Sequence, residues 1–257
     1  MMPSLFISHG APSLALEQNE YTEFLQDLGG RIGKPDAIVL FSAHWERPQL
    51  TFTFTDQTYQ TIYDFYGFPD ELYQITYPAQ GSTNVATRLE QLFAAHGIPA
   101  VREEQRGLDH GAWVVLKLLF PQADIPVVAA SVNPHLPPPE QYRIGQALRS
   151  LGRQNILLIG SGAVTHNLRL LNWHAQEPDD WAVAFDDWIV RHVQQWDLDA
   201  LFAYAERAPY ARQAVPRSEH FVPLFIAMGA ADERRQAQLL HRSYQYGSLS
   251  MIAFQFG

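Results

Sequence analysis

The sequence predicts an α/β fold in which a mostly parallel central sheet is flanked by helices. Short apolar runs bounded by glycine, proline or polar residues are typical of strands, and they alternate with segments whose apolar residues recur at helical spacing. Several runs are apolar throughout, as expected of parallel strands that are buried on both faces. The chain of 257 residues contains no internal repeat and no proline-, glycine- or serine-rich linker, so we expect 1–257 to form one domain.

Six segments have the short apolar pattern of strands, and they lie at 4–8, 37–43, 50–55, 125–132, 155–160 and 248–256. The segment 50–55 alternates apolar and polar residues, which predicts an edge or half-exposed strand. Helices are expected between the strands, at 19–28, 83–96, 111–120, 139–151, 179–195 and 218–228. The long segment 56–80 is irregular and aromatic, and loops of that length in a compact domain often carry function.

Charge and composition exclude several classes of protein. The formal net charge is −9 and no window is strongly basic, so we expect no nucleic-acid partner and no polybasic membrane anchor. The chain has no cysteine, which excludes disulfides, thiolate metal sites and a cysteine nucleophile. No apolar stretch approaches the ~18 residues of a membrane span, and the N-terminus lacks a signal-peptide pattern. We expect a soluble cytoplasmic protein, either a monomer or a small homo-oligomer.

Two of the predicted strands run directly into a histidine. The first ends in SHG with His9, and the second ends in SAH with His44, about one βαβ unit further on. Parallel strands bring their carboxyl ends to one edge of the sheet, where open α/β folds bind ligands. If the two strands are neighbours, about 4.8 Å apart, the imidazoles converge on one metal ion. The alternative is that each histidine only caps its strand.

Two further histidines follow expected element boundaries. The sequence GSGAVTHNL lacks the third glycine of a dinucleotide-binding loop, so we expect instead a tight turn at 160–162 that delivers His166 to the same edge. In GLDHGAW, His110 precedes an expected helix start at Gly111, where the helix dipole disfavours a positive charge. A neutral His110 suits hydrogen bonding or proton transfer. Asp109 either orients His110 or caps the helix.

The sequence RSEHFVPLF supplies a candidate third metal ligand. Glu219 and His220 are adjacent, and on a helix their side chains point about 100° apart, so only one of them faces a given site. The pattern alone leaves both residues open as the ligand.

Taken in order, the motifs SHGAP, SAHWE, TIYDFYGFP, GLDHGAW, GSGAVTHNL and EHFVPLF resemble the class III extradiol ring-cleaving dioxygenases of the LigB-like superfamily. The closer likeness is to their bacterial 4,5-DOPA extradiol dioxygenase group, and it runs on to YGSLSMIAFQF, over essentially the whole chain. It implies one mononuclear metal at the carboxyl edge of the sheet, held by His9, His44 and His220. Better-known relatives have a glutamate as the third ligand, which keeps Glu219 as the alternative.

The resemblance also implies roles for residues around the metal. His110 and His166 match catalytic residues that handle oxygen and protons. His166 is in addition a candidate fourth ligand when no substrate is bound, because Zn²⁺ prefers four tetrahedral ligands. Tyr63, Asp64 and Phe65 are expected on the side where the substrate binds.

The implied activity is extradiol cleavage of a catechol such as L-DOPA (4,5-cleavage), with O2 as the second substrate. Ring cleavage normally calls for Fe²⁺, whereas three or four histidines form a good Zn²⁺ site, so we expect zinc in the purified protein and leave the active metal open. A zinc-dependent hydrolase that uses the same histidines is one alternative, and a non-catalytic binding module is another. Caffeate and simpler catechols also stay open as substrates.

Overall fold

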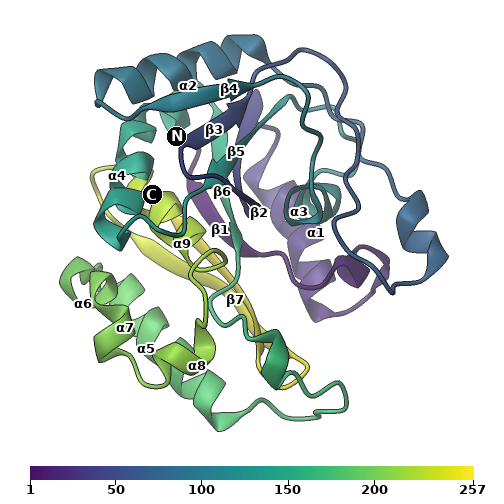
Figure 1. Cartoon of the computed structure of the whole chain (residues 1–257), viewed down its shortest axis with the longest axis vertical. Coiled ribbons are helices and arrows are strands. Elements are labelled where there is room, and N and C mark those ends of the chain that lie inside the picture. The colour runs from purple at the N-terminus through teal and green to yellow at the C-terminus, as the bar shows by residue number, and fades with distance from the viewer.

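The apolar segments of the chain form the centre of one eight-stranded sheet. The computed structural model describes residues 1–257, and its strands follow the order β4-β3-β5-β2-β6-β1-β8-β7 (Figure 1). The four central strands pair in parallel, and they are β5 (Val127–Val132), β2 (Ala37–Glu46), β6 (Ile156–Gly162) and β1 (Ser4–Ser8). These strands are covered on both faces, which is why their sequences are apolar almost throughout.

The outer strands carry more polar residues. On one side β8 (Leu249–Phe256) runs antiparallel to β1, and β7 (Ala237–Gln245) forms the edge. On the other side β3 (Leu50–Thr53) lies next to β5 and pairs in parallel with β4 (Ala100–Glu103), the opposite edge. The sequence prediction missed β4 and β7, because both are half exposed and neither contains an apolar run. The expectation that 50–55 forms an edge or half-exposed strand was wrong, since β3 lies between β4 and β5 and all of its residues are buried.

Nine helices accompany the sheet: α1 (Glu20–Ile32), α2 (Thr83–Ala95), α3 (His110–Leu119), α4 (Pro138–Ala147), α5 (Asp180–Gln194), α6 (Leu198–Phe202), α7 (Tyr204–Arg207), α8 (Ala211–Ala214) and α9 (Val222–Gly229). Successive residues of β2 pack into two separate cores. Phe41 belongs to the core formed with α2, α4, α5 and α9, whereas Leu40 belongs to the core formed with α1 and α3.

The predicted α/β fold with a mostly parallel, helix-flanked sheet is confirmed. No helix combines the length and the apolar sequence needed to cross a membrane.

The segment 160–162 is not the expected tight turn but the end of β6. Helix α9 and the turn before it cross this strand so closely that a Cβ on Gly162 would lie 2.1 Å from the carbonyl oxygen of His220. A Cβ on Gly160 would lie 2.3 Å from the carbonyl oxygen of Pro223. Glycine is therefore required for close approach of the backbones rather than for a turn.

The segment 56–80 is irregular, as expected, apart from a 3₁₀ turn at Asp70–Gln74 and two isolated bridges, Thr58 to Gln80 and Thr61 to Leu108. The bridge from Thr61 to Leu108 places the segment beside the start of α3, where Asp64 of the segment reaches His110.

Candidate metal centre and active-site cavity

His9 and His44 meet at the carboxyl edge of the sheet. His9 directly follows β1, and its backbone N–H donates to the carbonyl oxygen of Gly162 at 3.1 Å, while His44 lies near the end of β2. The two Nε2 atoms are 3.0 Å apart. The condition set in the sequence analysis, that the two strands be neighbours, is not met, because β6 lies between β1 and β2. The side chains converge above the end of that intervening strand.

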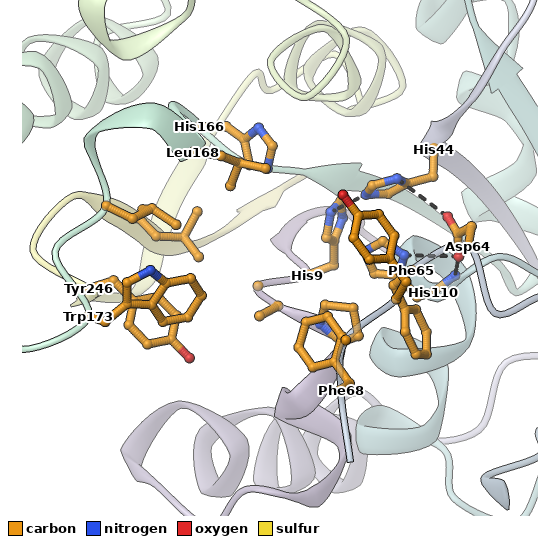
Figure 2. Close-up of a pocket in the computed structure, with 17 residues that line it drawn as sticks. His9, His44, Asp64, Phe65, Phe68, His110, His166, Leu168, Trp173 and Tyr246 are labelled. Carbon is orange, nitrogen blue, oxygen red and sulfur yellow. Dashed lines mark hydrogen bonds and ion pairs between the residues drawn. The ribbon is translucent and has the colours of Figure 1, made fainter. Parts of the chain in front are cut away.

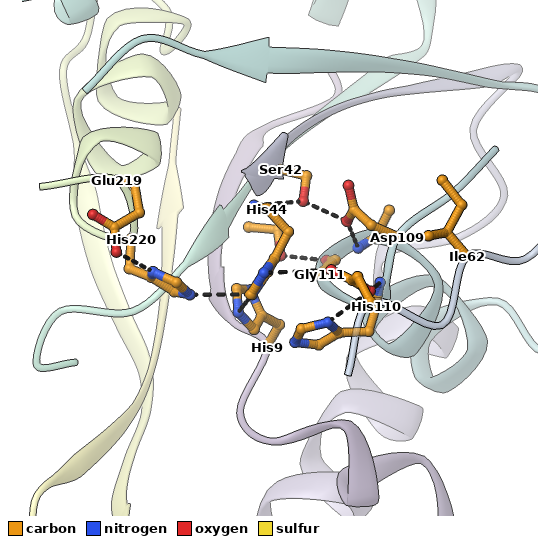
Figure 3. Close-up of polar contacts among 12 residues, drawn as sticks. His9, Ser42, His44, Ile62, Asp109, His110, Gly111, Glu219 and His220 are labelled. Carbon is orange, nitrogen blue, oxygen red and sulfur yellow. Dashed lines mark hydrogen bonds and ion pairs between the residues drawn. The ribbon is translucent and has the colours of Figure 1, made fainter. Parts of the chain in front are cut away.

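His220 joins this pair from the other side of the sheet edge (Figure 3). It lies in the turn before α9, and its carbonyl oxygen accepts from the backbone N–H of Ala163 at 2.8 Å, which ties the turn to the end of β6. Its Nε2 atom is 3.1 Å from Nε2 of His44. The Nε2 atoms of His9 and His220 therefore both lie next to Nε2 of His44, which is the middle one of the three.

The second nitrogen of each ring faces a hydrogen-bond acceptor. Ser161 donates its hydroxyl proton to the carbonyl of Gly111, so it accepts from Nδ1 of His9 at 3.0 Å. Nδ1 of His220 donates to Oε1 of Glu219 at 3.2 Å. These partners keep the protons on Nδ1 and leave the Nε2 lone pairs of the rings directed at one another.

This arrangement fits a mononuclear metal ion. The Nε2 lone pairs of His9 and His220 each lie about 3 Å from that of His44, and lone pairs at such distances repel one another unless a cation lies between them. Tetrahedral coordination at 2.0–2.1 Å, the usual Zn–N distance, separates ligand nitrogens by about 3.3 Å, close to the observed 3.0 and 3.1 Å. Burial, together with the neighbouring imidazoles, holds the pKa of His9 and of His220 well below the ordinary value. Burial also lowers the pKa of His44 to about 3, so all three rings are neutral, as metal binding requires.

Asp64 connects the metal centre to His110. Its Oδ1 accepts from both the backbone N–H and Nδ1 of His110 at 3.0 Å, and its Oδ2 lies 3.4 Å from Nδ1 of His44. Burial raises the pKa of this carboxyl, but the hydrogen bonds and charge of His110 outweigh it and lower the pKa to about 2. The ring of His110 lies 3.9 Å from that of His44, and His9, His44 and His110 bring their ligand atoms within 4.8 Å of one another.

Asp109 caps α3 rather than orienting His110. Its Oδ1 accepts from the backbone N–H of Ala112 at 3.2 Å and from the hydroxyl of Ser42 at 2.6 Å. Its Oδ2 accepts from Arg106 at 2.9 Å. Of the two roles that the sequence left open, the structure has the helix cap, and α3 begins at His110 itself.

His166 lies beside His220 instead of pointing at the same centre. The two rings stack with centroids 3.5 Å apart and planes only 9° from parallel. Burial is the main cause that lowers the pKa of His166 to about 4. Glu219 lies behind His220 with little exposed surface, so in this structure His220, not Glu219, points at His9 and His44.

A cavity of about 610 Å³ opens over the histidines (Figure 2). His9, His44, His110 and His166 line it together with Asp64, and its apolar walls are formed by Pro12, Phe65, Tyr66, Phe68, Leu168, Leu171, Trp173, Tyr246 and Leu249. Of the three residues expected on the substrate side, Asp64 and Phe65 line the cavity. Tyr63 does not, because its hydroxyl donates to the carbonyl of Ile75 at 2.8 Å and its ring packs behind Phe65.

Several cavity residues were missed by the sequence analysis. Leu168, Leu171 and Trp173 follow His166 in an irregular segment, where no periodic pattern marks them. One sequence feature could have drawn attention to Ser161: it lies between the two glycines of GSG at the end of a predicted strand. Its hydrogen bond to His9, however, joins residues 152 positions apart and has no local sequence pattern.

The chain is similar to known proteins both in sequence and in structure. Residues 3–257 match the family described as the catalytic LigB subunit of aromatic ring-opening dioxygenase. The chain is 41% identical to a 4,5-DOPA dioxygenase extradiol of Beta vulgaris, covering 98% of this chain and 96% of that protein, and 37% identical to one of Escherichia coli (strain K12), covering 100% and 95%. A crystal structure of an uncharacterized protein from Escherichia coli K12 superposes with a TM-score of 0.84 at 33% identity over all of both chains. The chain therefore belongs to the LigB family of aromatic ring-opening dioxygenase catalytic subunits.

Proposed function

We propose that this protein is an extradiol dioxygenase that opens the ring of a catechol with O2, and that L-DOPA is the first substrate to test. The convergence of three neutral imidazole nitrogens below an apolar cavity is the observation that carries the proposal. Membership of a ring-opening family supports the same chemistry, and the names of the relatives motivate the choice of L-DOPA.

His9, His44 and His220 are the proposed ligands of one metal ion. Glu219 then orients His220 through the hydrogen bond to Nδ1 and is not itself a ligand. When bound, Fe²⁺ supplies the electron relay between catechol and O2 that redox-inactive Zn²⁺ lacks. We propose Fe²⁺ as the active metal, and we expect Zn²⁺ to compete for this imidazole site during purification.

His166 is the proposed base that accepts a phenolic proton from the catechol. It lines the cavity, and a pKa of about 4 keeps its ring neutral at pH 7. Because its ring is parallel to that of His220, the in-plane lone pairs of the two rings run side by side and do not meet at one point. This stacking favours the acid–base role of His166, and the role of a fourth ligand would require the ring to turn away from His220.

His110 is the proposed donor to negative charge that develops on oxygen. Its Nδ1 is held by the Asp64 carboxylate, so the Nε2 edge of the ring is the one left free to face the cavity. The carboxylate also stabilises the ring when Nε2 carries a proton, and such a ring donates a hydrogen bond into the site.

Oxygen uptake tests the proposal most directly. Metal-free protein is reconstituted without air with Fe²⁺ or with Zn²⁺, and L-DOPA and oxygen are then added. We expect O2 consumption and a yellow ring-opened product with Fe²⁺ only. A zinc-dependent hydrolase with the same histidines would consume no O2, so absence of uptake across a panel of catechols with both metals would exclude the dioxygenase.

A further inference from the structure

Asp186 is a carboxylate that the fold buries completely, outside the cavity. It lies in α5 with no exposed surface, and its neighbours Phe185 and Ile189 on the helix belong to the hydrophobic core. It does not line the cavity and has no part in the chemistry proposed above. A carboxylate that loses its water costs free energy unless hydrogen bonds and opposite charge replace the hydration. The contacts of Asp186 therefore indicate what the buried group does.

Two hydroxyl groups from distant parts of the chain donate to this carboxylate. Thr165 donates to Oδ1 at 3.0 Å, and Ser250 of β8 donates to Oδ2 at 2.6 Å. Nε of Arg242 lies 3.8 Å from Oδ2. Burial raises the pKa of Asp186 to about 6, and the hydrogen bonds together with the charge of Arg242 limit the rise. At pH 7.5 the carboxylate is mostly ionised and accepts from both hydroxyls.

Thr165 joins this network to the active site, because it directly precedes His166. The carbonyl oxygen of Thr165 accepts from the backbone N–H of Ser250 at 3.4 Å, and the backbone N–H of His166 donates to the carbonyl of Ala214 at 2.9 Å. The hydrogen bond from the Thr165 hydroxyl adds a side-chain anchor to these backbone contacts. Thr165 itself is fully buried, so water does not compete for the hydroxyl.

The ring of His166 needs such an anchor more than the other histidines do. His9, His110 and His220 each have a hydrogen-bond partner at Nδ1. The ring of His166 has no partner in another residue, and it lies flat against that of His220 with centroids 3.5 Å apart. Its position therefore depends on the backbone that carries it, and a shift of Thr165 moves the ring.

We propose that Asp186 is a positioning residue that accepts the Thr165 hydroxyl and thereby keeps the ring of His166 at the cavity. The inference rests on the proposed function, in which His166 accepts a phenolic proton. Asp186 contacts neither substrate nor metal in this role and acts only through Thr165. Proton transfer requires the base within hydrogen-bond reach of the proton, so a small displacement of the ring slows the reaction.

Thr165→Val tests the anchor, because it removes the hydroxyl and keeps the shape of the side chain. We expect kcat of the Fe²⁺-loaded protein, measured by O2 uptake at saturating catechol, to fall about tenfold. KM and the amount of bound metal should change less than about twofold, because neither the cavity walls nor the proposed ligands are altered. Thr165→Ser keeps the hydroxyl and should restore kcat to within about threefold of the wild-type value.

Ser250→Ala is the matched control, since it removes the other hydroxyl that donates to the same carboxylate. Ser250 is also fully buried and does not line the cavity, and its backbone N–H still donates to Thr165 in this variant. Ser250→Ala and Thr165→Val each lose one buried hydrogen bond, and we expect each to lower Tm by about 2–4 °C. Only Thr165→Val should lower kcat, which separates positioning of His166 from stability.

The position of the His166 ring is also measured without turnover. A ring proton that lies over the face of another ring is shifted upfield in the ¹H NMR spectrum, and the stacked rings of His166 and His220 meet this condition. The signal is assigned by its absence from His166→Gln, in the metal-free and in the Zn²⁺-loaded protein. We expect Thr165→Val to move the signal toward that of free histidine, whereas Thr165→Ser and Ser250→Ala leave it in place.

Asp186→Ala removes the acceptor instead of the donor. It is expected to lower kcat and to move the His166 signal as Thr165→Val does. Combining the two substitutions should change neither quantity further, because the two residues act through one hydrogen bond. If one of the two single variants does not fold, the other carries the test.

The possible results separate this proposal from the dioxygenase proposal. Positioning by Asp186 is overturned if Thr165→Val keeps the wild-type His166 signal, if Ser250→Ala moves that signal as far as Thr165→Val does, or if Thr165→Ser fails to restore it. If the signal moves as expected but no catechol supports O2 uptake in the wild-type protein, Asp186 still positions His166 and the dioxygenase proposal fails.

Discussion

The Nε2 atoms of His44 and His220 lie 3.1 Å apart, although 176 positions separate the two residues in the sequence. His44 comes from β2 and His220 from the turn before α9, so the contact exists only in the folded chain. The other nitrogen of each ring faces a carboxylate, Asp64 or Glu219. Two lone pairs are left facing each other, and a shared cation relieves their repulsion. Metal binding and folding are therefore expected to be coupled.

The first prediction separates the two candidates for the third ligand. His220→Ala removes an imidazole nitrogen, and we expect the protein to retain no stoichiometric metal after dialysis. Glu219→Gln removes only the charge of the hydrogen-bond acceptor behind the ring, and we expect an affinity about tenfold lower. Metal analysis and competition with a chromogenic chelator measure both. His135→Ala, at an exposed position, is the control. Retention of metal by His220→Ala together with loss by Glu219→Gln would make Glu219 the ligand.

The second prediction concerns pH. Protons compete with a metal only near or below the pKa of its ligands, and burial lowers the pKa of His44 to about 3. We therefore expect the Zn²⁺ affinity of the folded protein to change less than about threefold between pH 7.5 and pH 5.5. Ligands with the ordinary pKa of about 6.5 would each lose about tenfold at pH 5.5. Chelator competition at the two pH values decides, and a steep loss toward pH 5.5 would mean that the ring pKa values are ordinary.

The third prediction tests His166 as acid–base residue. His166→Gln is expected to lower kcat by about 10² to 10⁴ while the bound metal stays stoichiometric, because the stacked ring does not point at the ligand nitrogens. His174→Gln, an exposed histidine in the segment that follows, is the control and should keep full activity. Loss of metal from His166→Gln in the substrate-free protein would instead identify His166 as a ligand.

The fourth prediction follows from the close contact between β6 and the turn before α9. Gly162→Ala would place a Cβ 2.1 Å from the carbonyl oxygen of His220, so the turn must move. We expect a loss of about 1–3 kcal/mol in the free energy of unfolding, together with weaker metal binding. Gly30→Ala is the matched control, since nothing lies within 4 Å of its added Cβ in α1. It should raise stability by about 0.5–1 kcal/mol. Equal stability of the two variants would contradict the packing argument.

The sequence predicted the centre of the fold better than its edges. The strands β1, β2, β5 and β6 are covered on both faces, and burial of that kind requires an unbroken apolar run that can be read locally. The edge strands β4 and β7 face water and have no such run. The order of the strands could not be predicted from the sequence either. In the sheet β6 lies between β1 and β2, although it is far from both of them in the chain.

His9, His44, His110 and His166 were predicted because each lies close to an expected strand end or helix start, whereas the choice of His220 over Glu219 came from the resemblance. Their partners were harder to find. Asp64 was expected on the substrate side. Its carboxylate also accepts a hydrogen bond from His110, a residue 46 positions away, and no local sequence pattern indicates that pairing. Tyr63 is adjacent in sequence but does not line the cavity, because its hydroxyl donates to the carbonyl oxygen of Ile75, a contact within the irregular segment that no sequence pattern marks.

Asp64 has a further consequence for how this enzyme can diversify. The same short stretch supplies Phe65 to the cavity and, through Asp64, holds both His44 and His110. A change on this side that reshapes the pocket also disturbs His44 and His110, which Asp64 holds. The opposite wall, from Leu168 to Trp173, makes no hydrogen bond to them. Substitutions in that segment can therefore change the substrate preference while the hydrogen bonds of the histidines stay intact. A library randomised over that segment should keep far more active members than one randomised around Asp64.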